Sequence, residues 1–407
     1  MRGGNLVVGQ AGGATAVINS SLVGVVESAL AAGYRAVYGM RRGAEGALQD
    51  DYVDLSSLAP ERLEAVATTP GAALASSRRM VSDEEIEALL TSYSDNDVTA
   101  MVYIGGNDSA DTVHRVARMA IDLGLDISAI AVPKTIDNDL PVTDHSPGYG
   151  SIARYVAVAT MDSAKDTESM PTMYPVKFIE VMGRDAGWVA AASALGKQRP
   201  ADAPHLIYVP ERPVSRTQLL DDVRRVYEEF GYVVAVVTET MRDEHGHPFA
   251  DPSSSGDRDA FGHPLLRGTA QAMVELVQSE LGLRARFDKP GSLQRMSTAF
   301  SSRVDVEEAR EAGRAAVQLA SADETDRMVT LVREADQPYR CSTSSAPLAA
   351  IANRQSLLPD EFLDRTGRMT TESFRRYALP LLGPDPFPRY ERIGDLPSIS
   401  LSHPHST

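Results

Sequence analysis

Residues 131–147 read AVPKTIDNDLPVTDHSP, and the prediction of the fold starts from this stretch. Residues 102–104 and 129–132 are short apolar runs bounded by turn residues, a pattern typical of buried strands in a parallel sheet. Ligands of open parallel sheets bind just beyond the carboxyl ends of the strands. Turn formation alone would explain an isolated loop rich in Asp and Asn. At this point in the chain, however, chemistry is expected from the crowded polar residues Lys134, Thr135, Asp137, Asn138, Asp139, Asp144 and His145.

Two glycine-rich turns lie upstream, each between an apolar run and a segment with helical periodicity. Glycine lets the backbone approach a ligand closely, and a helix N-terminus favours an anion. Two such turns on neighbouring strands predict a cradle for a polyphosphate chain, the alternative being tight packing of strand against helix. The first turn contains Gly12 and Gly13, and the second contains Gly105, Gly106, Asn107, Asp108 and Ser109.

Composition narrows the class of protein. The chain has 407 residues and a formal net charge of −16, which argues against a broad basic face for nucleic acid. No apolar run approaches the length needed to span a membrane, so no membrane partner is expected. A single cysteine, Cys341, excludes an internal disulfide and a cysteine-based metal cluster. These features are typical of a cytoplasmic protein.

The strings PKTIDND, VVGQAGGATAVINSSL and VMGRDAGW together resemble the phosphofructokinase family, over about residues 5–345. The resemblance implies that Asp137 accepts the proton of a sugar 1-hydroxyl, with Lys134 and Arg184 completing the catalytic set. It implies a donor site made of Gly12, Gly13, Arg78, Gly106, Asn107, Asp108 and Ser109. It implies a sugar-phosphate site made of Thr135, Asp139, Met182, Gly183, Glu239, Arg286 and Arg295.

The implied phosphoryl donor is pyrophosphate. Relatives that use ATP commonly carry glycine at the positions of Asp108 and Lys134, whereas relatives that use pyrophosphate carry aspartate and lysine, as here. An aspartate would repel the α-phosphate of a nucleotide, and a lysine can pair with pyrophosphate oxygens as a compact charge. The implied cofactor is Mg²⁺, with Asn107 and Asp108 as ligands. Asn107 stands where the best-known relatives have an acid, so it would coordinate through its amide oxygen or a bound water.

The implied acceptor is fructose 6-phosphate, phosphorylated reversibly on its 1-hydroxyl. Two positions depart from the family pattern on this side: Pro175 stands where a neighbouring subunit usually lends an arginine, and Ser292 stands where a histidine or tyrosine is common. Three alternatives therefore stay open: another ketose phosphate such as sedoheptulose 7-phosphate or allulose 6-phosphate, ATP as donor, and a non-catalytic sugar-phosphate-binding subunit. The shared sugar site implies a homodimer or homotetramer.

The expected architecture is α/β, with two Rossmann-like parallel-sheet domains and the active site in the cleft between them. Residues 1–146 and 296–322 are predicted to form the phosphate-donor domain. Residues 147–295 and 323–360 are predicted to form the sugar-phosphate domain. Residues 361–407 are predicted to form a C-terminal extension ending in a Pro- and Ser-rich tail. Residues 241–265 are polar and are predicted to be a surface insertion.

Overall fold

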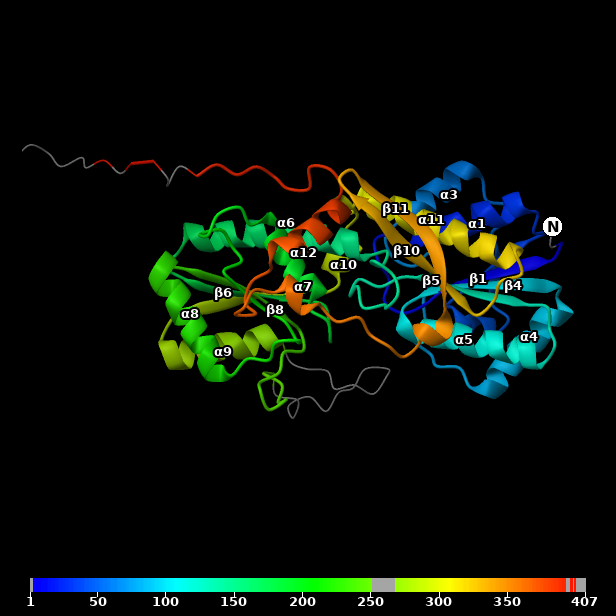
Figure 1. Cartoon of the computed structure of the whole chain (residues 1–407), viewed down its shortest axis with the longest axis horizontal. Coiled ribbons are helices and arrows are strands. Elements are labelled where there is room, and N and C mark those ends of the chain that lie inside the picture. Colours follow the sequence, from blue (N-terminus) through cyan, green and yellow to red (C-terminus); the bar gives the residue numbers. More distant parts are fainter. Residues whose placement is uncertain (1–2, 251–267, 393–395, 398, 400–407) are drawn as a thin grey trace, which may run out of the picture.

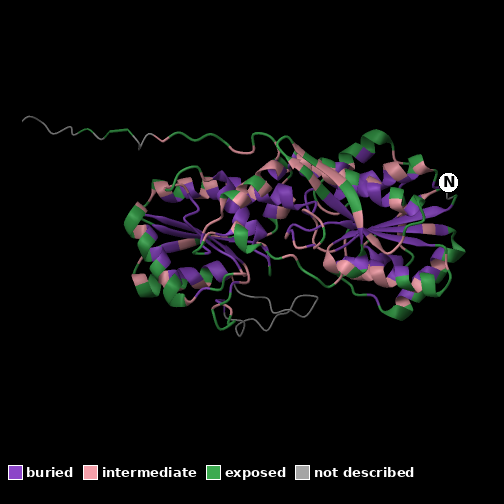
Figure 2. Cartoon of the chain, in the orientation of Figure 1, coloured by how far each residue is buried: buried purple, intermediate pink, exposed green. Residues whose placement is uncertain are grey.

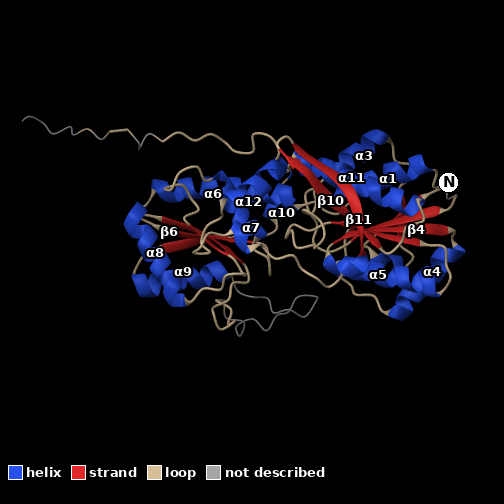
Figure 3. Ribbon diagram, viewed as in Figure 1, coloured by secondary structure: helices blue, strands red, loops and turns tan. Residues whose placement is uncertain are grey.

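The chain folds into two α/β domains that lie side by side (Figure 1). This computed structural model describes residues 3–250, 268–392, 396–397 and 399. Each domain has a central sheet with helices on both faces, which confirms the predicted fold class (Figure 3). The predicted insertion at residues 241–265 is described only as far as residue 250, and its remainder lies outside the described residues.

The first domain contains a seven-stranded sheet in the order β11-β10-β5-β4-β1-β2-β3. Its central strands pair in parallel, and β1 and β5 are buried along their whole length, as their apolar sequences predict. The strands are β1 (Asn5–Gln10), β2 (Val37–Met40), β3 (Tyr52–Asp54), β4 (Val98–Gly105), β5 (Ser128–Pro133), β10 (Arg327–Asp336) and β11 (Tyr339–Pro347).

Helices cover both faces of this sheet. One face carries α1, α3 and α11, and the opposite face carries α4 and α5. A capping box begins α4, with Ser82 and Glu85 exchanging side-chain-to-backbone hydrogen bonds. The helices are α1 (Ile18–Ala32), α2 (Ala44–Ala47), α3 (Pro60–Ala67), α4 (Asp83–Asp95), α5 (Asn107–Asp122) and α11 (Arg303–Ser321), with the 3₁₀ helix η4 (Leu348–Ala350).

The second domain contains a four-stranded parallel sheet in the order β7-β8-β6-β9. Its strands are β6 (Val176–Val181), β7 (Leu206–Tyr208), β8 (Val233–Thr238) and β9 (Ala285–Asp288). Helices α6, α7 and α12 cover one face, and α8 and α9 cover the other. Their bounds are α6 (Tyr149–Ser169), α7 (Trp188–Ala192), α8 (Arg216–Phe230), α9 (Thr269–Leu281), α10 (Leu293–Met296) and α12 (Glu372–Ala378). The 3₁₀ helices are η1 (Ser193–Gly196), η3 (Thr298–Phe300), η5 (Asp360–Phe362) and η6 (Leu379–Leu382).

The structure corrects one part of the predicted domain division. The assignment of all of residues 323–360 to the second domain is wrong, because β10 pairs in parallel with β5 and extends the first sheet.

The first part of the predicted C-terminal extension, residues 361–382, packs into the core of the second domain (Figure 2). Phe374 and Leu382 in this segment are fully buried. The Pro- and Ser-rich tail predicted from the sequence follows directly, from Gly383.

No helix among the described residues combines the length and the apolar character that crossing a membrane requires.

Candidate active site

Residues 134–139 form the loop that leaves the carboxyl end of β5. The backbone N–H of Lys134 donates to the carbonyl of Gly105, at the end of the neighbouring strand β4. The backbone N–H of Asp137 donates to Oγ1 of Thr135 at 3.1 Å, which folds the loop back on itself. Both strands are parallel neighbours, so the loop and the second glycine turn meet at one edge of the sheet. This is the edge at which the sequence predicts a ligand.

The side chain of Lys134 is buried and points to the first glycine turn. Only 4% of the residue is exposed, and its Nζ donates to the carbonyl of Gly13 at 2.8 Å. Burial lowers the pKa of Lys134 to about 8, while the nearby carboxylate of Asp137 opposes that shift. The ammonium therefore keeps its charge at neutral pH in a poorly solvated position, where an anion interacts with it strongly.

Two guanidinium groups reach the same turn from distant parts of the chain. A Cβ atom built at Gly13 would lie 2.5 Å from Nη1 of Arg295 and 3.7 Å from Nη2 of Arg78. The segment that carries Arg78 is tied to the turn, because Oγ of Ser76 donates to the carbonyl of Gly12 at 2.7 Å. Together with Lys134 these groups place three cationic side chains around one glycine turn. The arrangement fits a multiply charged anion.

The second glycine turn begins helix α5. Gly106 is its N-cap residue, and a Cβ atom at Gly105 would lie 2.1 Å from Oγ of Ser109, so only glycine fits there. The amide nitrogen of Asn107 donates to the carbonyl of Arg354, and its Oδ1 is buried without a hydrogen-bond partner. The start of a helix of this length also favours negative charge.

Asp137 lies half-buried beside this cationic cluster. Desolvation by the surrounding protein raises the pKa of Asp137 to about 7, and the carboxylates of Asp139 and Glu239 add to the rise. Lys134 and Arg184 oppose it. A carboxyl group with a pKa close to neutrality is well suited to accept a proton and to release it again.

The second domain contributes the carboxyl ends of β6 and β8. Glu239 follows β8, and burial raises its pKa with a further contribution from Glu180. The MGR turn follows β6, and the backbone N–H of Met182 donates to Oε1 of Gln294 at 3.1 Å. Gly183 has a φ of 118°, a conformation that favours glycine. The contact with Gln294 fixes this turn against α10, the helix that carries Arg295.

Arg286 is the predicted residue that does not join the others. It pairs with Asp166, and its guanidinium carbon lies 5.3 Å from the centre of the Tyr174 ring. In the sheet it stands opposite Lys177, four residues before the end of β6. That separation is about 13 Å along the strand from the end of β6, where the MGR turn begins.

Several residues in the site were missed by sequence reasoning. Nζ of Lys289 lies 2.6 Å from Oε1 of the buried Glu180, whose Oε2 accepts from the backbone of Ala270 at the start of α9. Glu180 lies inside the apolar strand β6. The only sequence signal for Glu180 was its charge within a run of buried apolar residues. The backbone of Ser356 donates to the carbonyl of Asp139 at 2.7 Å, and this late segment carried no recognisable motif.

Metal ligation in the site depends on few groups. The described residues contain no cluster of three or more His, Cys, Asp or Glu side chains that could hold a metal ion. The buried, unpartnered Oδ1 of Asn107 is an available oxygen ligand at the second glycine turn. The carboxylate of Asp108, an exposed residue, follows it directly in the chain.

Comparison with known proteins identifies the family of the chain. The family model described as Phosphofructokinase matches residues 5–320. The chain belongs to the phosphofructokinase family. A pyrophosphate–fructose 6-phosphate 1-phosphotransferase of Halomonas elongata is 38% identical, and the match covers 98% of this chain and 96% of that protein. A protein of the same name from Xanthomonas campestris pv. campestris is 39% identical, with 96% of each chain covered.

Solved structures of this family give the same result. The crystal structure of a pyrophosphate-dependent phosphofructokinase from Marinobacter aquaeolei superposes with a TM-score of 0.85 at 35% identity, covering 95% of this chain and 94% of that chain. The two-domain phosphofructokinase fold and the enzymatic character predicted from the sequence are thereby confirmed.

Proposed function

We propose that this enzyme transfers a phosphoryl group reversibly between pyrophosphate and the 1-hydroxyl of fructose 6-phosphate. The observation that carries the proposal is the convergence of Lys134, Arg78 and Arg295 on the Gly12–Gly13 turn, beside the half-buried carboxyl group of Asp137. Three cations suit a compact, highly charged donor, and an adjacent base suits a hydroxyl acceptor.

The proposed reaction assigns each group a step. The oxygen of the sugar 1-hydroxyl attacks the terminal phosphorus, the bond from that phosphorus to the bridging oxygen breaks, and phosphate leaves. Asp137 takes the hydroxyl proton. Lys134 and Arg78 offset the charge on the transferring group and on the leaving phosphate. In this proposal the two glycine turns hold the pyrophosphate in place before the reaction. Catalysis then consists mainly of positioning the reacting groups and stabilising the charge that develops.

The residues at the start of α5 fit a magnesium ion. Asn107 offers a buried amide oxygen without a hydrogen-bond partner, and the carboxylate of Asp108 is the next side chain along the helix. Hard oxygen ligands of this kind suit Mg²⁺, which usually keeps several waters and binds substrate phosphates directly. When bound, the ion would neutralise part of the pyrophosphate charge.

The acceptor is held from the second domain in this proposal. Glu239 would accept hydrogen bonds from sugar hydroxyls, and Arg295 would bind the phosphate of the sugar near the Gly12–Gly13 turn. Thr135 and Asp139, on the loop after β5, and Met182 and Gly183, on the turn after β6, would complete the sugar site. Relatives that cover nearly the whole chain carry the names of pyrophosphate- and fructose 6-phosphate-dependent enzymes, so ATP, other ketose phosphates and a non-catalytic role are not favoured.

Arg286 would act in a neighbouring subunit. Its guanidinium lies over the partly exposed ring of Tyr174, on a strand residue that pairs with Lys177, four residues before the end of β6. This placement supports a homodimer or homotetramer in which Arg286 completes the sugar-phosphate site of the partner. The location proposed for this enzyme is the cytoplasm.

A turnover panel tests the proposal. Pyrophosphate and ATP, each with Mg²⁺, are combined with fructose 6-phosphate, allulose 6-phosphate and sedoheptulose 7-phosphate, and the phosphorylated sugar is measured. The expected result is turnover with pyrophosphate and fructose 6-phosphate. Turnover with ATP alone would overturn the donor assignment, and turnover with another sugar alone would overturn the acceptor. A protein that is inactive with every pair would contradict the proposal as a whole.

A further inference from the structure

Asn138 separates the two acidic residues of the catalytic loop, and its conformation is unusual. Its φ is 54°, in the left-handed region, and its side chain is buried. The amide oxygen accepts from the backbone N–H of Ser146 at 2.9 Å, and the amide nitrogen donates to the hydroxyl of Tyr377 at 2.9 Å. Both ends of the Asn138 side chain are therefore held, one by the backbone of the same loop and the other by Tyr377 on helix α12.

The hydroxyl of Tyr377 closes a circuit around this loop. It accepts from Asn138 and donates to the backbone carbonyl of Asp144 at 2.8 Å. Burial raises the pKa of Tyr377, so the hydroxyl keeps the proton that it donates. One hydroxyl thus joins the two ends of the segment 138–144, directly after Asp137.

The ring of Tyr377 is itself fixed. It stacks on Phe362 with ring centres 5.3 Å apart, and it packs against Trp188 at 5.4 Å. The guanidinium of Arg333 lies 4.7 Å from the ring centre on the first domain's side. Because the ring is held by the core of the second domain and by β10, the position of its hydroxyl is determined by packing rather than by the loop.

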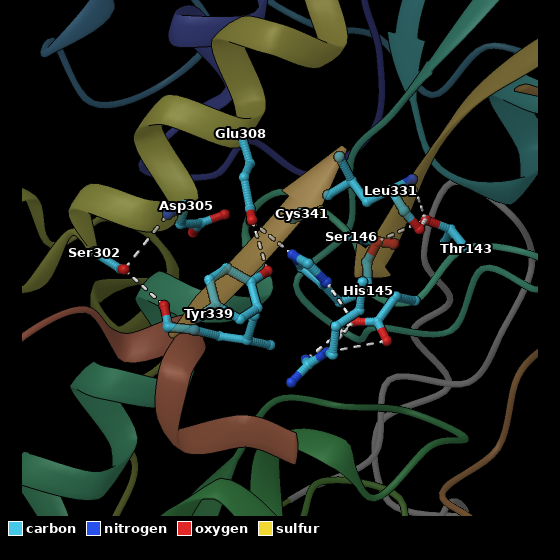
Figure 4. Close-up of polar contacts among 12 residues, drawn as sticks. Thr143, His145, Ser146, Ser302, Asp305, Glu308, Leu331, Tyr339 and Cys341 are labelled. Carbon is cyan, nitrogen blue, oxygen red and sulfur yellow. Dashed lines mark hydrogen bonds and ion pairs between the residues drawn. The ribbon is translucent and has the colours of Figure 1, made fainter. Parts of the chain in front are cut away.

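The far end of the loop is held by a chain of charged groups (Figure 4). Asp144 pairs with Arg333 and with Nδ1 of His145, and Nε2 of His145 lies 2.6 Å from Oε2 of Glu308 on α11. Burial lowers the pKa of His145, but its hydrogen bonds to Asp144 and Glu308 outweigh this effect and raise it to about 9. The hydroxyl of Tyr339 donates to the second oxygen of Glu308 at 2.6 Å.

We infer that Tyr377 is a positioning residue for Asp137, acting through its hydrogen bonds to Asn138 and to the carbonyl of Asp144. The inference rests on the proposed role of Asp137 as the base. Tyr377 touches no reacting atom. It fixes the backbone on the carboxyl side of Asp137, as the bond from Asp137 to Thr135 fixes the other side. Small displacements of a reacting group reduce turnover strongly, so loss of this hydroxyl should affect the reaction step more than binding.

The test compares Tyr377→Phe with Tyr339→Phe in the full-length enzyme. Both variants lose a hydroxyl from the same polar network and keep the ring, but only Tyr377 touches the segment 138–144. We expect Tyr377→Phe to lower kcat between about tenfold and a hundredfold, with KM for pyrophosphate and fructose 6-phosphate within about twofold of wild type. Tyr339→Phe should keep kcat within about twofold. Equal kcat losses in the two variants, or a loss expressed mainly in KM, would overturn the inference.

A double-substitution cycle separates positioning from general destabilisation. Asn138→Gly removes the partner side chain and tolerates the left-handed backbone. Because Tyr377 acts through Asn138 as well as through the carbonyl of Asp144, the kcat loss of the combined variant should be smaller than the product of the two single losses. A combined loss equal to that product would overturn the inference. A wild-type enzyme without pyrophosphate-dependent turnover would instead show that the proposed function is wrong, so the two failures are distinguishable.

Discussion

Nζ of Lys134 lies 3.2 Å from the position that a Cβ atom would occupy at Gly12. Gly12 has a φ of 74°, so a side chain there meets both backbone strain and the buried ammonium. We expect Gly12→Ala to lower the free energy of unfolding by about 1–2 kcal/mol and to raise KM for pyrophosphate about tenfold, because Lys134 must move. Gly124→Ala is the matched control, since Gly124 has a φ of 68° and open space around it. Equal values of KM in both variants would contradict the contact's role.

Replacing Asp137 by asparagine removes the proposed base and keeps the shape of the side chain. We expect Asp137→Asn to lower kcat by about 10²–10⁴-fold. Pyrophosphate should still bind, because the cationic side chains around the Gly12–Gly13 turn remain. Steady-state kinetics and calorimetric titration of pyrophosphate measure the two effects. Asp122→Asn, at the exposed end of α5, should leave both unchanged. Full turnover by Asp137→Asn would remove this residue from the mechanism.

The pH dependence of turnover should follow the ionisation of Asp137 and of Lys134, two neighbouring groups of opposite charge. Asp137 must be ionised to accept a proton, so kcat/KM in the direction of sugar phosphorylation should rise as pH increases through about 7. It should fall again above about 8, as Lys134 loses its charge. A profile between pH 5.5 and 9.5 at saturating Mg²⁺ measures both limbs.

Glu239→Gln distinguishes enzyme groups from the titration of pyrophosphate itself. The carboxylate of Glu239 raises the pKa of Asp137, so its removal should move the acid limb to lower pH, whatever it does to the maximal rate. Glu61→Gln, on the exposed first turn of α3, should leave the limb in place. If the midpoint of the acid limb is unchanged in Glu239→Gln, or moves to higher pH, Asp137 does not control that limb.

A substitution at Phe374 tests whether helix α12 is part of the folded core of the second domain. Its side chain is fully buried, and its ring centre lies 5.7 Å from that of Phe362. We expect Phe374→Ala to cost about 3–5 kcal/mol of unfolding free energy, through lost burial and the cavity left behind. Leu357→Ala, at a residue that is 50% exposed, should cost far less. Denaturant unfolding followed by tryptophan fluorescence is a direct probe, because Trp188 packs against Phe362. Similar midpoints for the two variants would mean that α12 contributes little.

The parts of the site that could be predicted are those at strand ends. Lys134, Asp137 and the glycines of both turns each follow an apolar run, and the carboxyl ends of parallel strands share one edge of a sheet. Local sequence therefore carried enough information to bring them together. Arg295 could be assigned only through the family resemblance, since nothing local indicates that a residue on α10 reaches Gly13.

The parts that could not be predicted depend on pairing between distant segments. β10 reads as an ordinary late strand, and its residues do not specify whether it joins β5 or the second sheet. Tyr377 sits on a short helix, where an aromatic residue usually means core packing. Its hydrogen bond to Asn138 joins positions 239 residues apart, and no spacing rule reaches that far.

The position of β10 beside β5 has a consequence for how this protein is made on the ribosome. β5 is completed early, but its neighbour emerges only after the whole second sheet has been synthesised. Helix α11, which packs against α1 and covers the same apolar face of the sheet at β5, also arrives late. Throughout that interval the nascent first domain presents an open strand edge and an uncovered apolar face, features that promote association between chains. Premature termination before Arg327 would thus leave an aggregation-prone fragment rather than an independently folded first domain.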